Sequence, residues 1–189
     1  MEKPTLRRSA ATSETLEPVR VDRWFAFVDL SGFTSFGDEF GDEASVRVLT
    51  LFRGAVRQVA TEFGVRIAKW LGDGCMLVSV EPAQLMGAVS QLETLTHDLE
   101  LPLSMHAGCA GGGVILLEGD DYTGRSVNLA ARLATAARPH EILATADLAV
   151  YATESTPCEP AGMITVAGIN DPVEIIRFGC EVVGDTVRA

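Results

Sequence analysis

The chain has 189 residues, 47% of them apolar, and its 15 basic and 26 acidic side chains give a formal charge of −11. Length and apolar content predict one domain with its own core, and the acidic balance argues against a nucleic-acid-binding surface, which needs clustered Lys and Arg. The sequence has no signal peptide, no C-x-x-C pair and no apolar run of the roughly 18 residues that a membrane span requires, so we expect a soluble cytoplasmic protein without a nucleic-acid or membrane partner.

The first 21 residues differ in composition from the rest of the chain. They lack apolar periodicity and contain Pro4 and Pro18, so we expect residues 1–21 to form a flexible leader and residues 22–189 the folded domain. From residue 24 onward, strand-like and helix-like patterns are separated by Gly, Pro and Asp. In chain order the predicted elements are a strand at 24–30, a turn and short helix at 32–41, a helix that Asp42 caps and Gly64 ends, a hairpin of 65–71 and 75–80, a helix at 82–100, a strand pair of 103–108 and 113–117, a helix at 124–137, and strands at 141–144, 163–167 and 173–178.

The order of these elements predicts an α+β fold class. A strand, two helices, two strands, a helix and a strand in succession are typical of a ferredoxin-like βααββαβ core, here followed by a C-terminal αβ extension. We expect an antiparallel sheet with the helices packed on one face. We interpret the glycines at 111–113 as the joint between two paired strands.

Two carboxylates stand where predicted strands end. Asp29 follows the apolar run 25–28 and precedes a loop that leads into a helix, so it can face a cation while the next backbone N–H groups face phosphate oxygens. Asp73 lies in the turn of the predicted hairpin. Both are also common turn residues, but two convergent carboxylates are a typical minimum for Mg²⁺ bound together with a nucleotide.

Lys69 and Asp121 are the next candidates. Lys69 interrupts an apolar strand, where the ordinary alternative is a solvent-facing Lys whose stem covers Trp70. Asp121 precedes the helix predicted at 124–137, where an acidic residue also favours the helix dipole. On these residues alone, both interpretations remain open.

Asn128 and Arg132 are four residues apart on the same predicted helix and therefore share one face of it. A surface Asn and an Arg in an intrahelical pair are the ordinary alternative. The guanidinium of Arg132 is nevertheless well suited to phosphate, because its fork of donors matches phosphate oxygens and stays charged.

Taken together, these motifs resemble in order and spacing the catalytic domain of the class III nucleotidyl cyclases, the adenylate and guanylate cyclase family. The resemblance covers about residues 23–178. It implies that Asp29, Asp73 and Leu30 bind two Mg²⁺ or Mn²⁺ ions, and that Phe33 and Thr34 contact the substrate. The implied activity is that of an adenylate cyclase, a lyase that forms 3′,5′-cyclic AMP and pyrophosphate from ATP for signal transduction.

The resemblance also assigns the purine and ribose contacts. Lys69 donates to a ring nitrogen of adenine and Asp121 accepts from its amine, whereas guanylate cyclases usually carry Glu and a small residue such as Cys, so ATP is favoured over GTP. The resemblance gives Asn128 the role of orienting the ribose. It gives Arg132 the role of stabilising phosphate charge in the transition state.

The family architecture implies a head-to-tail homodimer with two shared active sites. Asp29 and Asp73 come from one chain. Lys69, Asp121, Asn128 and Arg132 come from its partner. The chain departs from the family in three places. The stretch 165–170 around Ala167 lacks the Lys that often holds the triphosphate, and Thr123 replaces an aromatic residue. The glycine joint at 111–113 with a short connection to Asp121 implies a reduced arm at the subunit contact.

Two alternatives remain open. One is a non-catalytic cyclase homology domain that binds nucleotide and acts in regulation, and the other is a guanylate cyclase. A P-loop nucleotidase is excluded, because no G-x-x-x-x-G-K-[ST] motif is present.

Overall fold

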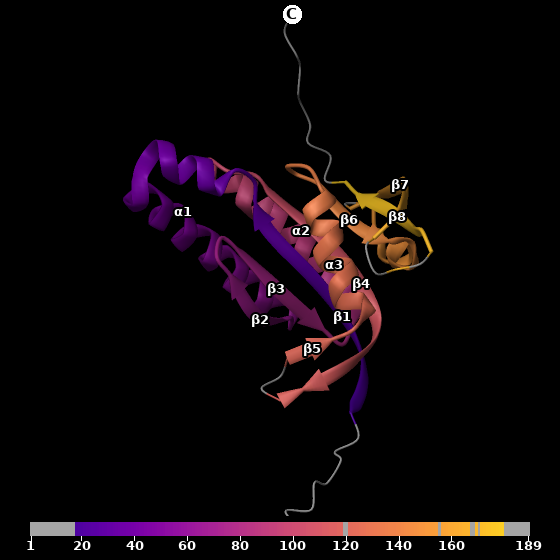
Figure 1. The fold of residues 1–189 in the computed structure, drawn as a ribbon. Coiled ribbons are helices and arrows are strands. Elements are labelled where there is room, and N and C mark those ends of the chain that lie inside the picture. The colour runs from indigo at the N-terminus through magenta and orange to yellow at the C-terminus, as the bar shows by residue number, and fades with distance from the viewer. Residues whose placement is uncertain (1–17, 119–120, 155, 167–168, 170, 180–189) are drawn as a thin grey trace, which may run out of the picture.

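The computed structural model of the chain describes residues 18–118, 121–154, 156–166, 169 and 171–179. One sheet runs through the domain, with helices on both sides (Figure 1). No helix within these residues is both long enough and apolar enough to cross a membrane. In chain order the elements are β1 (Val19–Leu30), α1 (Phe33–Phe63), β2 (Arg66–Leu71), β3 (Gly74–Ser79), α2 (Pro82–Asp98), β4 (Met105–Leu117), β5 (Asp121–Thr123), α3 (Arg125–Ala136), β6 (Ile142–Thr145), the 3-10 helix η2 (Ala146–Tyr151), β7 (Cys158–Ile164) and β8 (Val173–Phe178).

The sheet has the order β2-β3-β1-β4-β6-β8-β7, and β5 pairs with β4 beside this path. β1 lies between β3 and β4 and is antiparallel to both. Among the described strands, the one parallel pair is β4 with β6. The segment β2-β3-β1-β4 is the ferredoxin-like core and β7 and β8 belong to the C-terminal extension, so the predicted α+β class is confirmed.

The helices cover both faces of the sheet. Ala26 and Val28 of β1 belong to the buried cluster formed with α1 and α2, whereas Phe25 belongs to the cluster formed with α3. Successive side chains of a strand point to opposite faces, and an uninterrupted apolar run must therefore be covered on both. The expected packing of helices on one face holds for α1 and α2, and α3 lies on the other.

α1 contains the two helices that the sequence predicts at 32–41 and 42–63. They join at Gly41, whose φ of 80° and ψ of 173° break the helical geometry. A positive φ of this kind strongly favours glycine. At this break the axis of α1 changes direction, so its first two turns, which follow the end of β1, are not in line with the rest of the helix.

β4 corrects one prediction. The expected strand pair of 103–108 and 113–117 is a single strand, Met105–Leu117, paired with β1 along its length. Its glycines allow neighbours to approach the strand: a Cβ on Gly108 would lie 2.0 Å from the Ala134 nitrogen of α3, and one on Gly111 would lie 2.1 Å from the Trp24 ring. The glycine-rich stretch is therefore a packing surface.

Other boundaries differ in smaller ways. β1 begins at Val19, three residues before the expected start of the domain at 22, and the remainder of the predicted leader, 1–17, lies outside the described residues. The short strand β5 and the 3-10 helix η2 form where the sequence predicts no regular structure. β5 pairs antiparallel with the end of β4.

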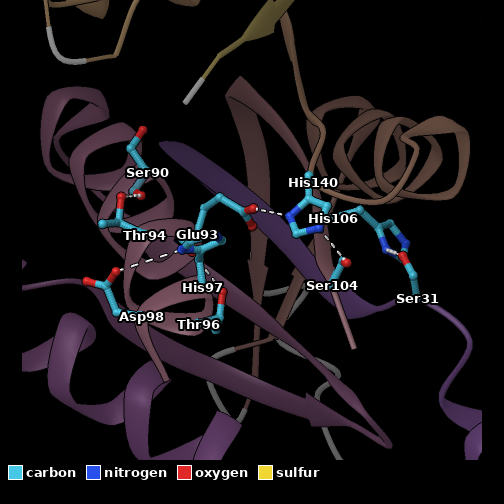
Figure 2. Close-up of polar contacts among 10 residues, drawn as sticks. All are labelled: Ser31, Ser90, Glu93, Thr94, Thr96, His97, Asp98, Ser104, His106 and His140. Carbon is cyan, nitrogen blue, oxygen red and sulfur yellow. Dashed lines mark hydrogen bonds and ion pairs between the residues drawn. The ribbon is translucent and has the colours of Figure 1, made fainter. Parts of the chain in front are cut away.

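A chain of polar contacts fixes the loop that follows α3. His140 donates through Nδ1 to Oε1 of the buried Glu93 on α2 (2.6 Å), and its Nε2 is hydrogen-bonded to Ser104 Oγ (2.6 Å). Figure 2 shows His140 between these two side chains, with the hydrogen-bonded Ser31 and His106 (3.0 Å) beside them. These contacts anchor the C-terminal end of α3 to α2 and to the start of β4.

Candidate functional site

The two predicted metal ligands lie together at the end of β1. β1 and β3 are antiparallel with Val28 opposite Cys75, which places Asp29 beside Gly74 and the turn that carries Asp73. A Cβ on Gly74 would come within 2.5 Å of the Val28 carbonyl oxygen and 2.6 Å of Asp29 Oδ1. Position 74 therefore requires glycine, because a side chain there would displace the Asp29 carboxylate.

The electrostatics of this pair fit a divalent cation. Burial raises the pKa of Asp29 to about 6, the charge of Asp73 adds to the rise, and a hydrogen bond from the Leu30 backbone N–H opposes it. A cation between the carboxylates would remove their repulsion, and carboxylate oxygens are preferred ligands of Mg²⁺. The described residues contain no group of three His, Cys, Asp or Glu side chains placed to hold a metal. The pair therefore suits a cation that also takes ligands from a bound phosphate or from water.

The N-terminus of α1 follows directly. Phe33 and Thr34 are the first two residues of the helix, and its N-cap, Gly32, has no side chain that could cap the first-turn N–H groups. Helix N-termini favour anions, because their N–H groups and the helix dipole point toward the ligand. The predicted substrate residues thus stand next to the predicted metal ligands, where a phosphate can contact both.

Lys69 and Asp121 are brought together from β2 and β5. Lys69 Nζ lies 2.7 Å from Asp121 Oδ1, and the two side chains are 45% and 41% exposed. The hydrogen bond from Lys69 and a second one from the Tyr122 N–H hold the pKa of Asp121 below its usual value. A cationic donor and an anionic acceptor therefore stand side by side at the surface.

Tyr122 is a supporting residue that the sequence did not reveal. Its ring packs edge-on against Phe25, with ring centroids 5.3 Å apart, and its hydroxyl accepts a hydrogen bond from Arg66 (3.0 Å). These contacts fasten β5 over the sheet and so place Asp121 next to Lys69. Only the pairing of β5 with β4 brings these residues together, and no local pattern signals it.

Asn128 and Arg132 lie on α3 with both side chains exposed, opposite its buried face. Within the described part of the chain, neither is hydrogen-bonded or ion-paired to Asp29 or Asp73. The structure thus groups the predicted residues into three sets: the carboxylates with the start of α1, the Lys69–Asp121 pair, and the outer face of α3.

Asp29 and Lys69 nevertheless share one side of the sheet. Asp29 continues the alternation of Phe25 and Phe27 toward α3, and Lys69 pairs with Met76, which also faces that side. A cavity of about 210 Å³ lies between the end of β1 and the second half of α3. Its lining residues are Phe27, Val28, Asp29, Leu71, Gly74, His106, Ala131, Ala134 and Thr135.

His106 is a further residue of this cavity that the sequence did not reveal. It lies opposite Asp29 in the pairing of β1 with β4. Burial lowers the pKa of His106, and the charge of Asp73 opposes this effect. A larger cavity, about 520 Å³, lies elsewhere, between α2 and the segment that contains η2. Asp29 and His106 are thus at the smaller one.

Comparison with known proteins agrees with this geometry. No protein-family model matches the chain. An uncharacterized protein of Mycobacterium tuberculosis is 39% identical over 150 residues, and a pH-sensitive adenylate cyclase of the same species is 35% identical over 119 residues. The first match covers 78% of this chain and 38% of the relative, and the second covers 62% and 29%. The chain thus corresponds to less than two fifths of these curated relatives.

Two solved structures match over nearly their whole length. The adenylyl cyclase CyaB from P. aeruginosa has a TM-score of 0.73 and 27% identity, over 87% of this chain and 96% of that one. The guanylyl cyclase Cya2 has a TM-score of 0.74 over 90% and 97%, and at 22% identity this likeness shows the fold alone. The chain belongs to the class III nucleotidyl cyclase family. Adenylyl and guanylyl cyclases thus share this fold, so the fold alone does not distinguish adenine from guanine.

Two of the departures from other class III cyclases concern Thr123 and the stretch around Ala167. Thr123 ends β5 and is exposed. Ala167 lies outside the described residues, while Val166 just before it is buried on the α3 side of the sheet.

The raised pKa of Asp29 predicts a pH-dependent affinity for Mn²⁺. A carboxylate must be deprotonated to bind metal, so with a pKa of about 6 binding should be strongest above pH 7 and about tenfold weaker near pH 5. Titration of the protein with Mn²⁺, followed by electron paramagnetic resonance, measures this directly. The Asp73→Asn variant should move the midpoint downward, because one cause of the raised pKa is removed. An affinity that stays constant from pH 7 to pH 5 would contradict the assignment.

Proposed function

We propose that this domain is an adenylate cyclase, which converts ATP into 3′,5′-cyclic AMP and pyrophosphate. The observation that carries the proposal is the Lys69–Asp121 pair, 2.7 Å apart, on the same side of the sheet as Asp29. A donor beside an acceptor matches the ring nitrogen and amine of adenine, while guanine presents the reverse polarity. Relatives named adenylate cyclase support the same choice.

The carboxylate pair would hold the metal ions. Asp29 and Asp73, with the adjoining backbone at Leu30, fit two Mg²⁺ or Mn²⁺ ions that would acidify the ribose 3′-hydroxyl and neutralise the phosphates when bound. The N–H groups of Phe33 and Thr34 would donate to phosphate oxygens. These groups together fix the triphosphate at the end of β1.

The remaining residues would act on the purine, the ribose and the developing charge. Lys69 and Asp121 orient the adenine, and Asn128 orients the ribose so that its 3′-oxygen faces the α-phosphorus. A new P–O bond forms there as the 3′-hydroxyl releases its proton to water, the bond to the β-phosphate oxygen breaks and pyrophosphate leaves. Arg132 stabilises the added charge with its fork of donors, so catalysis rests mainly on positioning and electrostatics.

A head-to-tail homodimer would complete the site. Asn128 and Arg132 are exposed and make no contact with the carboxylates within the described residues, so a second copy is the simplest source of a complete set. Large apolar side chains support such a contact: Leu71 beside the cavity is 44% exposed, and Leu117 opposite Asp121 is 45% exposed. Exposed apolar groups gathered around a site are typical of interaction surfaces.

The direct test is cyclic nucleotide formation by the purified protein. With Mn²⁺ and ATP we expect cyclic AMP, and the Asp29→Asn variant should lose at least about a hundredfold in kcat/KM, because a metal ligand is removed. Asp22→Asn, a change at an exposed position of β1, serves as the matched control. Nucleotide binding without any Asp29-dependent product would instead support the non-catalytic alternative.

The choice of base has its own test. The double variant Lys69→Glu and Asp121→Cys should shift the ratio of ATP to GTP turnover toward GTP by about tenfold or more, because the donor and acceptor are exchanged for groups that suit guanine. Parallel assays with the two nucleotides give this ratio. If the unmodified protein turns over GTP as fast as ATP, the guanylate cyclase alternative replaces this assignment.

A further inference from the structure

The tip of the β2–β3 hairpin is held from α1 by one arginine. Arg53 donates through Nη2 to the carbonyl oxygen of Gly72 (2.9 Å), and its guanidinium lies 5.0 Å from the ring centroid of Trp70. Gly72 directly precedes Asp73, and Trp70 directly follows Lys69. Arg53 therefore contacts the backbone and side chain that lie between these two functional residues.

The charge of Arg53 also reaches the carboxylate end of the site. Burial raises the pKa of the Cys75 thiol to about 12, with Asp29 adding to the rise and Arg53 opposing it. The Arg53 Nε is buried and has no hydrogen-bond partner among the described residues. The guanidinium is thus packed against the turn that carries Asp73.

We propose that Arg53 is a positioning residue that fixes residues 69–73, so that Lys69 is placed for the purine and Asp73 for the metal. This inference rests on the proposed function. Residues that orient a metal ligand typically change metal affinity or activity by about 10- to 100-fold when removed. In the proposed homodimer Lys69 and Asp73 of one chain serve different sites, so Arg53 would act on both sites at once.

The chain offers a matched control one helical turn away. Arg57 lies 5.3 Å from the centroid of the same Trp70 ring and carries the same charge. Within the described residues it makes no hydrogen bond to the hairpin turn. Comparing the two arginines therefore separates the contact with Gly72 from general effects of charge and of stacking on Trp70.

The experiment compares Arg53→Gln, Arg53→Lys and Arg57→Gln in the full chain. Mn²⁺ affinity is measured without nucleotide by electron paramagnetic resonance. KM and kcat are measured in assays with ATP, and folding is checked by thermal unfolding. We expect Arg53→Gln to weaken Mn²⁺ binding about tenfold and to raise the KM for ATP, and Arg57→Gln to change both by no more than about twofold. Arg53→Lys should fall between them, because it keeps the charge but not the planar fork of donors.

Unchanged Mn²⁺ affinity in a folded Arg53→Gln protein would overturn the inference, and so would equal losses in Arg53→Gln and Arg57→Gln. If Arg53→Gln does not fold, the Mn²⁺ affinity of Arg53→Lys decides in the same way, with wild-type affinity as the contrary result. The Mn²⁺ comparison needs no turnover. A wild-type protein that forms no cyclic nucleotide would therefore refute the proposed function and leave the role of Arg53 to be decided by metal binding.

Discussion

Two carboxylates that repel each other at the end of a buried strand are the constraint on which the rest of the structure depends. The pairing of β1 with β3 places Asp29 against Gly74 and close to Asp73, and burial with this repulsion raises the Asp29 pKa to about 6. Such an arrangement costs stability unless a cation is bound. The contacts around the two carboxylates hold this arrangement in place. One of them is the hydrogen bond from Arg53 to the Gly72 carbonyl oxygen in the hairpin turn.

The same sheet is the basis of the proposal that one copy holds an incomplete site. α1 and α2 pack on one face, while α3 packs on β1, β4 and β6 on the other (Figure 1). Asn128 and Arg132 of α3 are exposed to solvent. The Lys69–Asp121 pair lies on this same side, and so does Asp29, which lines a cavity together with the exposed Leu71. In the proposed homodimer, a second copy on this face would cover apolar surface and supply the remaining groups, and assembly would then be required for activity.

Much of this architecture is predictable from local signals. Apolar alternation, the Gly-Asp-Gly turn and Pro82 predict β1, the hairpin and α2, because these patterns act over a few residues. β4 was divided in the prediction because its glycines serve neighbours that are distant in sequence, Trp24 and α3. Arg53, His106 and Tyr122 were missed for the same reason. The roles of the site residues came from the family resemblance, and only the spatial pairing of Lys69 with Asp121 and of Asp29 with the Asp73 turn is seen in the structure.

The shared site is tested most directly by mixing two inactive variants. Asp29→Asn and Arg132→Ala each damage both sites of a homodimer, but a mixed dimer holds one site built entirely from unmodified residues. Equal amounts of the two proteins, allowed to exchange subunits, should recover about a quarter of wild-type cyclic AMP formation, since half of the dimers are mixed and each has one intact site. Activity of the mixture no greater than the sum of the separate variants would contradict the account.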